Sequence, residues 1–352
     1  MEIKFEKRNV LKEKPNLSDL RFGKYMSDYM FVMDYDSEWK NPRIVPYEPI
    51  SIDPASIVLQ YSTQTFEGMK AYRHHDELYL FRPRMNAKRL NRSNSRLCIP
   101  MIDEDVFIEA VESLVKIEKD WIPDEIGYSL YLRPFIIGLD ESLAVKKSRK
   151  YQFIIVASPV PNYYFLGNDL MNIYVEDIYV RSILGGTGDI KCGANYASTI
   201  LASKNAYQQG YDQVLWLDGI HRKYIEEVGT MNIFFVIDNV VYTPSLNGSI
   251  LDGITRDSII SLLKDRNIKV IEDRIDINFI MNAIDNKSLS EAFACGTAAL
   301  IAPIKSMHYK KKTALISNEI GPLSKQLYDE LTSIQWGLKE DKNNFRYKIK
   351  QD

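Results

Sequence analysis

One lysine lies among glycines near the middle of the chain. The stretch Gly185–Tyr196 reads GGTGDIKCGANY, with Lys191 as its single basic residue. Glycine lacks a Cβ atom, so the backbone can turn sharply or approach a ligand closely at these positions. A lysine held away from water favours the neutral amine, which can form a Schiff base with an aldehyde cofactor. On this stretch alone, a surface loop with a solvated lysine is the favoured interpretation, and the other motifs change that judgement.

Spacing excludes two other kinds of glycine-rich site. The dinucleotide-binding fingerprint G-x-G-x-x-G requires a third glycine at the position that Lys191 occupies. A phosphate-binding P-loop requires a lysine directly after glycine, but Asp189 and Ile190 separate Lys191 from Gly188. The stretch therefore predicts neither kind of nucleotide site.

A pyridine aldehyde cofactor needs a lysine, an acid at its ring nitrogen, a phosphate site and a donor to its phenolate oxygen. Glu227 lies where a strand begins, and Gly253–Thr255 begins a helix whose N–H groups and dipole suit a phosphate. Arg89 lies in a basic helix, and Gly296–Ala298 is a packing bend or an anion-binding turn. Each signal is weak alone, because such acids are usually solvated and every helix has an N-terminus.

The composition is that of an ordinary globular protein. The chain has 352 residues, of which 45% are hydrophobic and 26% charged, and this length suits two domains that share a cleft. The formal net charge of -2 gives no general attraction for nucleic acid or an anionic membrane. Apolar runs such as Phe234–Ile237 are far too short to span a bilayer.

Cysteine and histidine indicate neither a disulfide framework nor a metal centre. Cys98, Cys192 and Cys295 are too few for a disulfide-stapled protein, so we expect a reducing cytoplasm. The four histidines lack metal-ligand spacing, so we expect no bound metal. The N-terminus carries Glu2 and Glu6 and no apolar segment, so we expect neither a secretory signal nor a transit peptide.

Hydrophobic periodicity predicts mixed strands and helices in the first half of the chain. We expect a polar arm up to about Leu20, either flexible or docked, and a short helix opened by Pro54. Asp103 is expected to cap a helix in which apolar residues recur at helical spacing over 106–115. Strands are expected over 29–34, 66–73, 78–82, 129–137 and 151–156.

The second half also mixes strands and helices. A helix over 197–209 should end at Gly210. Asp238 and Asn239 tolerate positive φ and predict a two-residue hairpin turn between strands 232–237 and 240–244. Further strands are expected over 172–180, 213–217 and 269–275, with a strand pair within 292–304, and further helices over 256–264, 279–283 and 320–334.

These elements predict an α+β fold of two domains with a site between them. We expect a smaller N-terminal domain over 1–164, an interdomain loop over 165–171, and a larger C-terminal domain over 172–352 that carries Lys191.

Five motifs stand in one order along the chain. They are Phe66–Ala71 (FEGMKA), Gly188–Tyr196 (G-x-x-K-x-G-x-N-Y), Gln213–Leu217 (QVLWL), Glu227–Asn232 (EVGTMN) and Gly296–Ala298 (GTA). With these motifs the chain resembles branched-chain amino-acid aminotransferases, which belong to the fold type IV class of pyridoxal 5'-phosphate (PLP) enzymes. The likeness runs from about Phe22 to about Trp336, and FEGMK and EVGTMN point to the subfamily.

The resemblance implies a role for each site residue. Lys191 would form the Schiff base with PLP and shuttle the proton. The ring nitrogen, the phenolate oxygen and the phosphate would be held by Glu227, by Tyr196, and by Arg89, Ile254, Thr255 and Thr297, respectively. The substrate carboxylate would meet Tyr61, Thr230 and Ala298. The substrate side chain would meet Phe22, Phe66, Tyr131 and Tyr163, with Tyr164 as the alternative to Tyr163.

The resemblance also implies a homodimer with its active site at the domain interface, in which Tyr131 and Arg133 reach into the neighbouring subunit's site. Mammalian members carry a Cys-x-x-Cys redox pair directly after the GTA turn, where this chain has Ala299 and Ala302. Redox control through such a pair is therefore not expected, and the missing presequence favours a cytoplasmic over a mitochondrial form.

The function implied by the resemblance is a branched-chain-amino-acid transaminase of branched-chain amino-acid biosynthesis. It would transfer the amino group of L-leucine, L-isoleucine or L-valine reversibly to 2-oxoglutarate, which gives glutamate. A D-amino-acid aminotransferase or an aminodeoxychorismate lyase on the same fold is an alternative, because pocket residues and not the cofactor set separate these activities. A non-catalytic PLP-binding protein is disfavoured because Lys191, Glu227, Tyr196 and Arg89 are all present.

Overall fold

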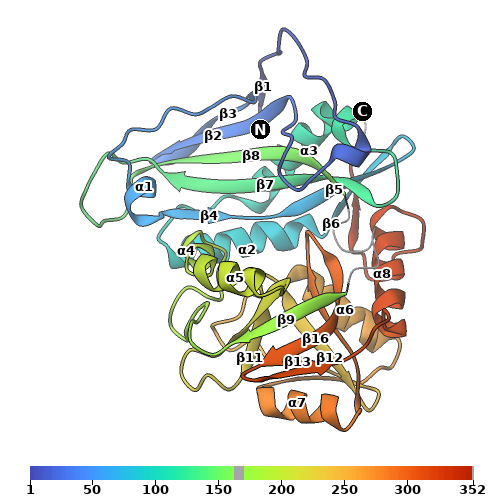
Figure 1. Cartoon of the computed structure of the whole chain (residues 1–352). Helices are drawn as coiled ribbons and strands as arrows, with labels where there is room; N and C mark the ends of the chain where they lie inside the picture. Colours follow the sequence, from blue (N-terminus) through green and yellow to red (C-terminus); the bar gives the residue numbers. More distant parts are fainter. Residues whose placement is uncertain (162–169, 351–352) are drawn as a thin grey trace. The chain divides into compact units, whose positions relative to one another are not determined.

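The computed structural model describes residues 1–161 and 170–350. The described chain forms two compact units, which Figure 1 shows coloured along the sequence. Residues 1–161, 191–193 and 333–350 belong to the first unit, and residues 170–190 and 194–332 to the second. The predicted domain boundaries stay a prediction, and most of the predicted loop 165–171 lies outside the described residues.

The first unit is built on a nine-stranded sheet. The strand order is β1-β3-β2-β8-β7-β5-β6-β18, with β4 paired to β7, and only β1 and β3 pair in parallel among these described strands. Figure 1 shows β3, β2, β8 and β7 in this order. The bounds are β1 Lys4–Phe5, β2 Tyr29–Asp36, β3 Glu38–Pro46, β4 Gln64–Phe66, β5 Met69–His74, β6 Glu77–Phe81, β7 Tyr128–Gly138, β8 Lys150–Pro161 and β18 Arg346–Lys348.

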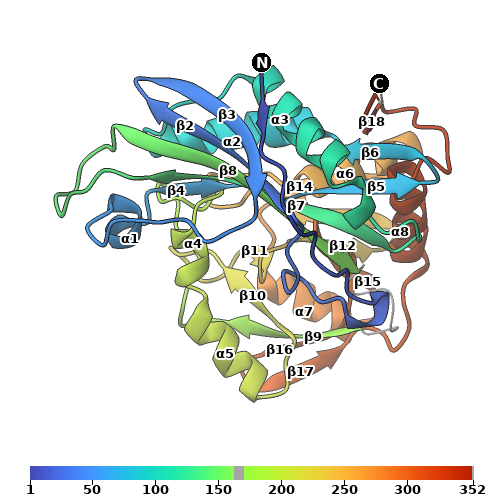
Figure 2. The ribbon, with the colours of Figure 1, turned by 90° about the horizontal axis from the view of Figure 1, so that it is seen from above.

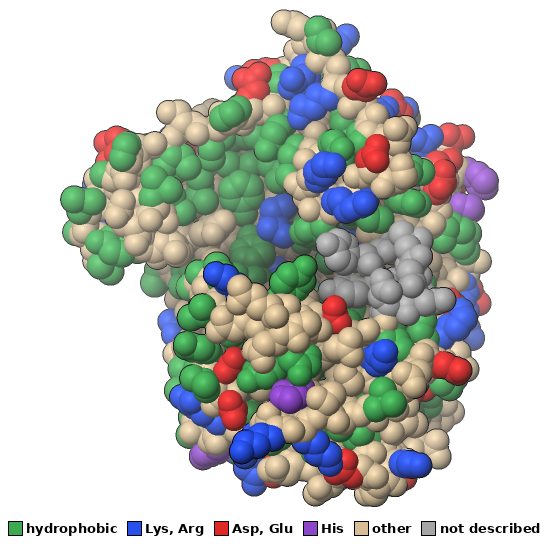
Figure 3. Space-filling view, viewed as in Figure 1, with side chains coloured by type: hydrophobic (Ala, Val, Ile, Leu, Met, Phe, Trp, Pro, Cys, Tyr) green, Lys and Arg blue, Asp and Glu red, His purple; other side chains and the backbone are tan. Residues whose placement is uncertain are grey.

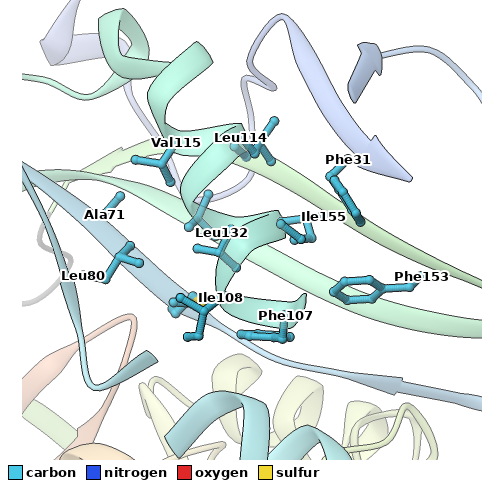
Figure 4. Packing of buried hydrophobic residues seen from close by; sticks show 14 of the residues in the cluster. Phe31, Ala71, Leu80, Phe107, Ile108, Leu114, Val115, Leu132, Phe153 and Ile155 are labelled. Carbon is cyan, nitrogen blue, oxygen red and sulfur yellow. The ribbon is translucent and has the colours of Figure 1, made fainter. Parts of the chain in front are cut away.

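Two long helices, α2 (Pro83–Arg96) and α3 (Glu104–Ile117), contribute to the core of this unit. α3 begins after Asp103, whose carboxylate accepts hydrogen bonds from two N–H groups of the first turn, so the predicted cap is confirmed. Phe107 of α3 stacks on Phe153 of β8 with ring centroids 5.9 Å apart. Figure 4 shows Phe107 and Leu114 of the helix with strand residues such as Leu132. Short helices are α1 Ile57–Tyr61, η1 Leu17–Asp19 and η2 Lys119–Trp121.

The second unit contains a nine-stranded mixed sheet. The order is β11-β10-β9-β16-β15-β12-β13-β14, with β17 paired to β16. β9 pairs in parallel with β10 and β16, and β13 pairs in parallel with β14. The bounds are β9 Met171–Glu176, β10 Gln213–Leu217, β11 Ile225–Val228, β12 Asn232–Ile237, β13 Val240–Pro244, β14 Val270–Asp273, β15 Leu289–Gly296, β16 Leu300–Tyr309 and β17 Lys312–Leu315.

Five of the described helices lie after residue 193. α5 (Ile200–Gln208) packs Ala202 and Ala206 against Trp216 of β10, and Figure 2 shows this helix beside β9 and β10. The other helices are α4 Ala194–Ala197, α6 Ile254–Asp265, α7 Ile277–Asp285 and α8 Pro322–Gln335.

Local signals predicted several elements well. Asp238 and Asn239 have φ values of 48° and 63°, so the predicted two-residue hairpin turn between β12 and β13 is confirmed. Gly210 has φ of 87° directly after the end of the α5 region, as expected for a residue that stops a helix. Strand β10 has the predicted bounds.

Three predicted elements differ because side chains form local turns. Asp53 accepts the N–H of Ala55, so Pro54 lies in a turn and α1 begins only at Ile57. The Thr199 hydroxyl donates to the Tyr196 carbonyl, and the helix expected over 197–209 is divided into α4 and α5. Strand β9 ends at Glu176, whose side chain accepts the next N–H groups, at 178 and 179, and so turns the chain. Strands β3, β17 and β18 were not predicted.

The N-terminal arm is docked on the first unit around Lys12. The N–H of Lys12 donates to Asp28 Oδ1 at 2.7 Å, and its ammonium group donates to the carbonyls of Met26 and Ser27 at 3.1 and 2.6 Å. Trp121 Nε1 donates to the other oxygen of Asp28 at 2.7 Å. Of the two alternatives for the arm, docking is therefore the one observed here.

Within residues 1–161 and 170–350, no helix has both the length and the hydrophobicity that crossing a membrane requires. The same residues contain no group of three or more His, Cys, Asp or Glu side chains arranged to hold a metal ion.

Glu118 is a buried carboxyl group beside the docked arm. Burial raises the pKa of Glu118 to about 7, and the charge of Asp28 acts in the same direction. Hydrogen bonds from Ser27 and from the N–H of Tyr29, together with the charge of Lys12, act in the opposite direction and only partly offset the effect.

We expect Glu118→Gln to remove a pH dependence of stability. The folded-state pKa of Glu118 lies above its ordinary value of 4.5, so its contribution is full below pH 4.5 and is lost as the pH rises through about 7. The difference corresponds to about 3 kcal/mol in the free energy of unfolding. Urea denaturation of both proteins across this pH range measures it, and parallel pH profiles for wild type and variant would contradict the assignment.

Candidate active site

Backbone contacts fix Lys191 in the first unit. The Phe66 N–H donates to the Lys191 carbonyl at 3.1 Å, and the Lys191 N–H donates to Ser93 Oγ at 3.0 Å. Cys192 forms a β-bridge with Thr65, so residues 191–193 run beside β4. The side chain of Lys191 places Nζ 4.9 Å from the centroid of the Phe66 ring. The position of this lysine is therefore fixed by hydrogen bonds of its own main-chain groups.

Four residues predicted to meet the substrate form one connected group, and its member Phe66 lies next to Lys191; they are Phe22, Phe66, Tyr131 and Arg133. The rings of Phe22 and Tyr131 meet edge to face with centroids 4.8 Å apart. The Arg133 guanidinium lies 4.9 Å from the Phe66 centroid and donates to the Tyr131 hydroxyl at 3.0 Å. Tyr131 and Arg133 thus contact the aromatic group next to Lys191 within one chain, and their reach into a neighbouring subunit's site stays a prediction.

Gly68 allows the close approach of Tyr131. A Cβ atom at this position would lie 2.0 Å from the Tyr131 hydroxyl oxygen, a distance that no packed side chain tolerates. The glycine of the FEGMK motif is therefore required by the packing of a neighbouring aromatic residue.

Glu67 and Arg89 form a buried ion pair. Arg89 Nε donates to Glu67 Oε1 at 2.7 Å and Nη2 donates to Oε2 at 2.9 Å, while Asn86 adds a bond of 2.8 Å to Oε2. The Glu67 side chain is 0% exposed and that of Arg89 is 7% exposed. The pair fixes the orientation of the arginine that the sequence predicted as a phosphate ligand.

The ion pair keeps Glu67 charged in the interior. Burial alone would raise the pKa of Glu67, but the charge and hydrogen bonds of Arg89, with the charge of Lys191 and a bond from Asn86, hold that pKa below its usual value.

We expect Glu67→Gln to destabilise the protein strongly. The substitution leaves the buried Arg89 without its carboxylate, and breaking such a pair costs about 3–5 kcal/mol in the free energy of unfolding. Since the folded-state pKa lies below its ordinary value of 4.5, the contribution in wild type is full above pH 4.5 and is lost as the pH falls further. Urea denaturation at neutral and acidic pH measures both effects.

Asp329→Asn is the matched control for this prediction. Asp329 pairs with Lys325 at 2.8 Å on the surface, where the two side chains are 55% and 59% exposed. Such surface pairs contribute about 0–1 kcal/mol. Equal losses of stability in the two variants would show that the Glu67 pair has no special weight.

Glu227 lies in the second unit on β11, and two groups fix one of its carboxylate oxygens. The N–H of Leu251 donates to Glu227 Oε1 at 2.7 Å, and Arg181 Nη2 lies 3.2 Å from the same oxygen. Both side chains of the ion pair are almost fully buried. The carboxylate predicted to meet a ring nitrogen is therefore held in one orientation.

A second buried carboxyl group lies next to this pair. The Ser249 hydroxyl donates to Glu226 Oε1, whereas Glu226 Oε2 is buried without a hydrogen-bond partner in the described chain. Burial raises the pKa of Glu226, with the charges of Glu227 and Asp218 in the same direction, against the Ser249 bond and the charge of Arg181. Two carboxyl groups thus share Arg181, and the cluster is suited to accept a further cationic N–H group.

The glycine-rich segment before Lys191 is tied together by polar groups. Asn195 Nδ2 donates to the carbonyls of Thr187 and Ile190 at 2.7 and 2.8 Å. A Cβ atom at Gly188 would lie 2.2 Å from both Ser182 Oγ and the Ser249 carbonyl oxygen. This close packing explains why glycine stands at position 188, and Tyr196 follows Asn195 directly on α4.

The predicted phosphate residues of the second unit lie at a helix start and a turn. α6 begins after Gly253, and no side chain of the described residues caps it. Ile254 and Thr255 in its first turn are buried. The first N–H groups and the dipole of such a 12-residue helix suit an anion. Thr297 lies in the turn between β15 and β16, which ends at Leu300 with φ of 60°.

The remaining predicted residues are placed as follows. Tyr61 is exposed at the end of α1, and its hydroxyl donates to the Leu143 carbonyl. Thr230 is exposed and Ala298 is half-buried, both in turns of the second unit. Tyr163 and its alternative Tyr164 lie outside the described residues.

Sequence reasoning missed Glu67, Arg181 and Asn195 as parts of the site. Glu67 and Asn195 lie within two of the motifs, so the sequence could have indicated them, but no role was assigned to either residue. Arg181 stood outside every motif, and only its contact with Glu227 reveals it.

Comparisons with known proteins show the family of this chain. Residues 64–307 match the family described as Amino-transferase class IV. The chain is 48% identical to the Probable branched-chain-amino-acid aminotransferase of Staphylococcus epidermidis, over 99% of this chain and 98% of that protein. It is 50% identical to Branched-chain-amino-acid transaminase 1 of Bacillus subtilis, over 95% of this chain and 96% of that protein.

Solved structures share the fold. The branched-chain amino acid aminotransferase from Escherichia coli is 27% identical, with a TM-score of 0.74, over 92% of this chain and 99% of that chain. The enzyme from Thermobaculum terrenum in its PLP form is 25% identical with the same TM-score of 0.74, again over 92% and 99%. The chain therefore belongs to the class IV aminotransferase family, with its two-domain fold type IV architecture, and to the branched-chain-amino-acid aminotransferases within it.

Proposed function

We propose that this protein is a branched-chain-amino-acid transaminase with PLP as its cofactor. It transfers amino groups reversibly between L-leucine, L-isoleucine or L-valine and 2-oxoglutarate. The observation that carries the proposal is the anchoring of Lys191 beside Phe66, in a chain that is 50% identical to the Bacillus subtilis transaminase. That the active site lies at the domain interface stays a prediction.

The residues present fit PLP in charge and in donor type. Glu227 is a buried carboxylate next to a second buried carboxyl group, Glu226, which suits a protonated ring nitrogen on Glu227. The start of α6, with Ile254 and Thr255, together with Arg89 and Thr297, would hold the phosphate, and Tyr196 the phenolate oxygen. When bound, the cofactor supplies an electron sink for cleavage of the substrate Cα–H bond.

Lys191 carries the covalent and the proton-transfer work. Its amino group would hold the cofactor as a Schiff base. With an amino acid bound, the free amine would take the substrate Cα proton as a general base and later give a proton back as a general acid. Two hydrogen bonds of the Lys191 main chain hold the lysine in place: its carbonyl accepts from the Phe66 N–H, and its N–H donates to Ser93 Oγ.

The substrate side chain meets the aromatic group of the first unit. Phe22, Phe66 and Tyr131 present ring surface that suits a branched aliphatic chain. We propose Tyr163 as a further pocket residue, and Tyr61, Thr230 and Ala298 as contacts of the substrate carboxylate.

Lys191→Ala is expected to abolish turnover and to leave the fold intact, because one amino group performs both chemical roles. Transfer from leucine to 2-oxoglutarate measures turnover, and circular dichroism with thermal denaturation checks the fold. A folded variant with near-normal turnover would refute the assignment of Lys191.

Arg133→Met is expected to discriminate between the two substrate classes. Arg133 is half-buried, and its Nε is buried without a hydrogen-bond partner in the described chain, so it suits the second carboxylate of 2-oxoglutarate. A hydrogen bond to a charged group is worth about 1.5–3 kcal/mol. We therefore expect kcat/KM for 2-oxoglutarate to fall by a factor of ~10 to ~100, and that for 4-methyl-2-oxopentanoate much less.

Arg43→Met is the control for this experiment. Arg43 pairs with Asp34 on the same sheet, at 2.7 Å, and is not among the proposed substrate residues. It should leave the ratio of the two kcat/KM values unchanged. Equal losses on both substrates in Arg133→Met would instead indicate that Arg133 only supports its neighbours.

The homodimer is also a proposal, supported by an apolar sheet face. Met30, Val32, Ile137 and Ile154 form a cluster separate from the main core, flanked by the partly buried residues Val45, Tyr47, Ile52, Val58, Phe135, Leu139 and Val156. Figure 3 shows hydrophobic side chains gathered over β2, β8 and β7 in the view of Figure 1. A second copy of the chain would cover this face.

We further propose that the protein works in the cytoplasm. Its three cysteines are free thiols in the structure, which suits a reducing compartment.

A further inference from the structure

Arg181 is a buried arginine that no sequence motif indicated. It belongs to the second unit, its side chain is 6% exposed, and its charged partner is the carboxylate of Glu227, with Nη2 and Oε1 3.2 Å apart. Arginine is rarely buried without such a partner, because the cost of removing its charge from water must be offset. The position of this charge is therefore tied to Glu227.

The same nitrogen also connects three segments of the chain. Arg181 Nη2 donates to the carbonyls of Gly188 and Ser249 at 3.0 and 2.5 Å. Gly188 stands three residues before Lys191 in the glycine-rich stretch. The Ser249 hydroxyl donates to Glu226. Two residues later, the Leu251 N–H donates to Glu227 Oε1. One guanidinium thus joins the acid, the lysine-bearing segment and the loop before α6.

The hydrogen bond from the Leu251 N–H and the ion pair with Arg181 both act on Oε1 and so hold this oxygen of the Glu227 carboxylate in place. A guanidinium at this distance also favours a charged over a protonated carboxyl group, against the nearby charge of Glu226. A ring nitrogen stays protonated only if the acid that faces it is ionised and correctly directed.

We propose that Arg181 is a positioning residue that holds Glu227 ionised and directed at the PLP ring nitrogen, an inference that rests on the proposed function. Arg181 acts through Glu227 and touches no reacting atom. Its removal should weaken only those interactions that involve the ring nitrogen.

The experiment compares binding of PLP and of 1-deaza-PLP, in which carbon replaces the ring nitrogen, to the full-length apoprotein. Arg181→Met should weaken PLP binding by a factor of about 10 to about 100, the range for a hydrogen bond to a charged group, and change 1-deaza-PLP binding little. Arg181→Lys, which retains the charge, should recover part of the loss.

A double-mutant cycle tests whether Arg181 acts through Glu227. Glu227→Gln alone should reproduce the selective loss on PLP, and adding Arg181→Met to it should cause little further loss. A full additional loss, an equal loss on both ligands, or unchanged or tighter PLP binding by Arg181→Met would overturn the inference.

Two further variants keep the test decisive. Arg181→Met removes the ion-pair partner of Glu227 next to a second buried carboxyl group, so the comparison is repeated in a Glu226→Gln background, which removes one of the two carboxyl groups. Arg266→Met, which breaks the ion pair with Glu330 on another part of the second unit, controls for the loss of an arginine and should bind both ligands as wild type does.

The outcomes separate this inference from the function on which it rests. If wild type fails to bind PLP, or if Glu227→Gln shows no preference between the two ligands, the cofactor assignment itself is wrong. If Glu227→Gln shows the selective loss and Arg181→Met does not, only the role of Arg181 is wrong.

Discussion

A charge that is buried in a protein must be offset by an opposite charge or by hydrogen bonds, and each unit of this molecule contains a buried glutamate that is paired with an arginine. Glu67 pairs with Arg89 in the first unit, and Glu227 pairs with Arg181 in the second. The two pairs differ in their charge balance. The first matches one acid with one arginine through two hydrogen bonds, whereas the second arginine also lies near Glu226.

This difference gives the pairs different consequences. The balanced pair stabilises the packing around β4 and α2 and orients Arg89. In the second unit two buried carboxyl groups lie close together, and such a pair of acids favours a positively charged ligand atom. The proposed binding of a protonated ring nitrogen to Glu227 is consistent with that arrangement.

Close backbone packing is the second constraint, and it explains two motif glycines. A side chain at Gly68 would overlap the Tyr131 hydroxyl, and one at Gly188 would overlap Ser182 and the Ser249 carbonyl. Tyr131 and Ser249 in turn contact Arg133 and Arg181. The glycines therefore make room for groups that contact Arg133 and Arg181, and a methyl group at either position would force those groups to move.

The sequence by itself determined what depends on neighbours along the chain. The Asp103 cap, the turn at Asp238 and Asn239, and the helix start at Gly253 need only local bonds and φ preferences, and all three are present. The motifs likewise indicated the family and the importance of Lys191, because residue types at fixed spacing carry that information. Tertiary structure alone decided which charges pair, that residues 191–193 and 333–350 belong to the first unit, and that Arg133 and Lys191 both lie against the ring of Phe66. These outcomes depend on contacts between distant segments, which no local preference encodes.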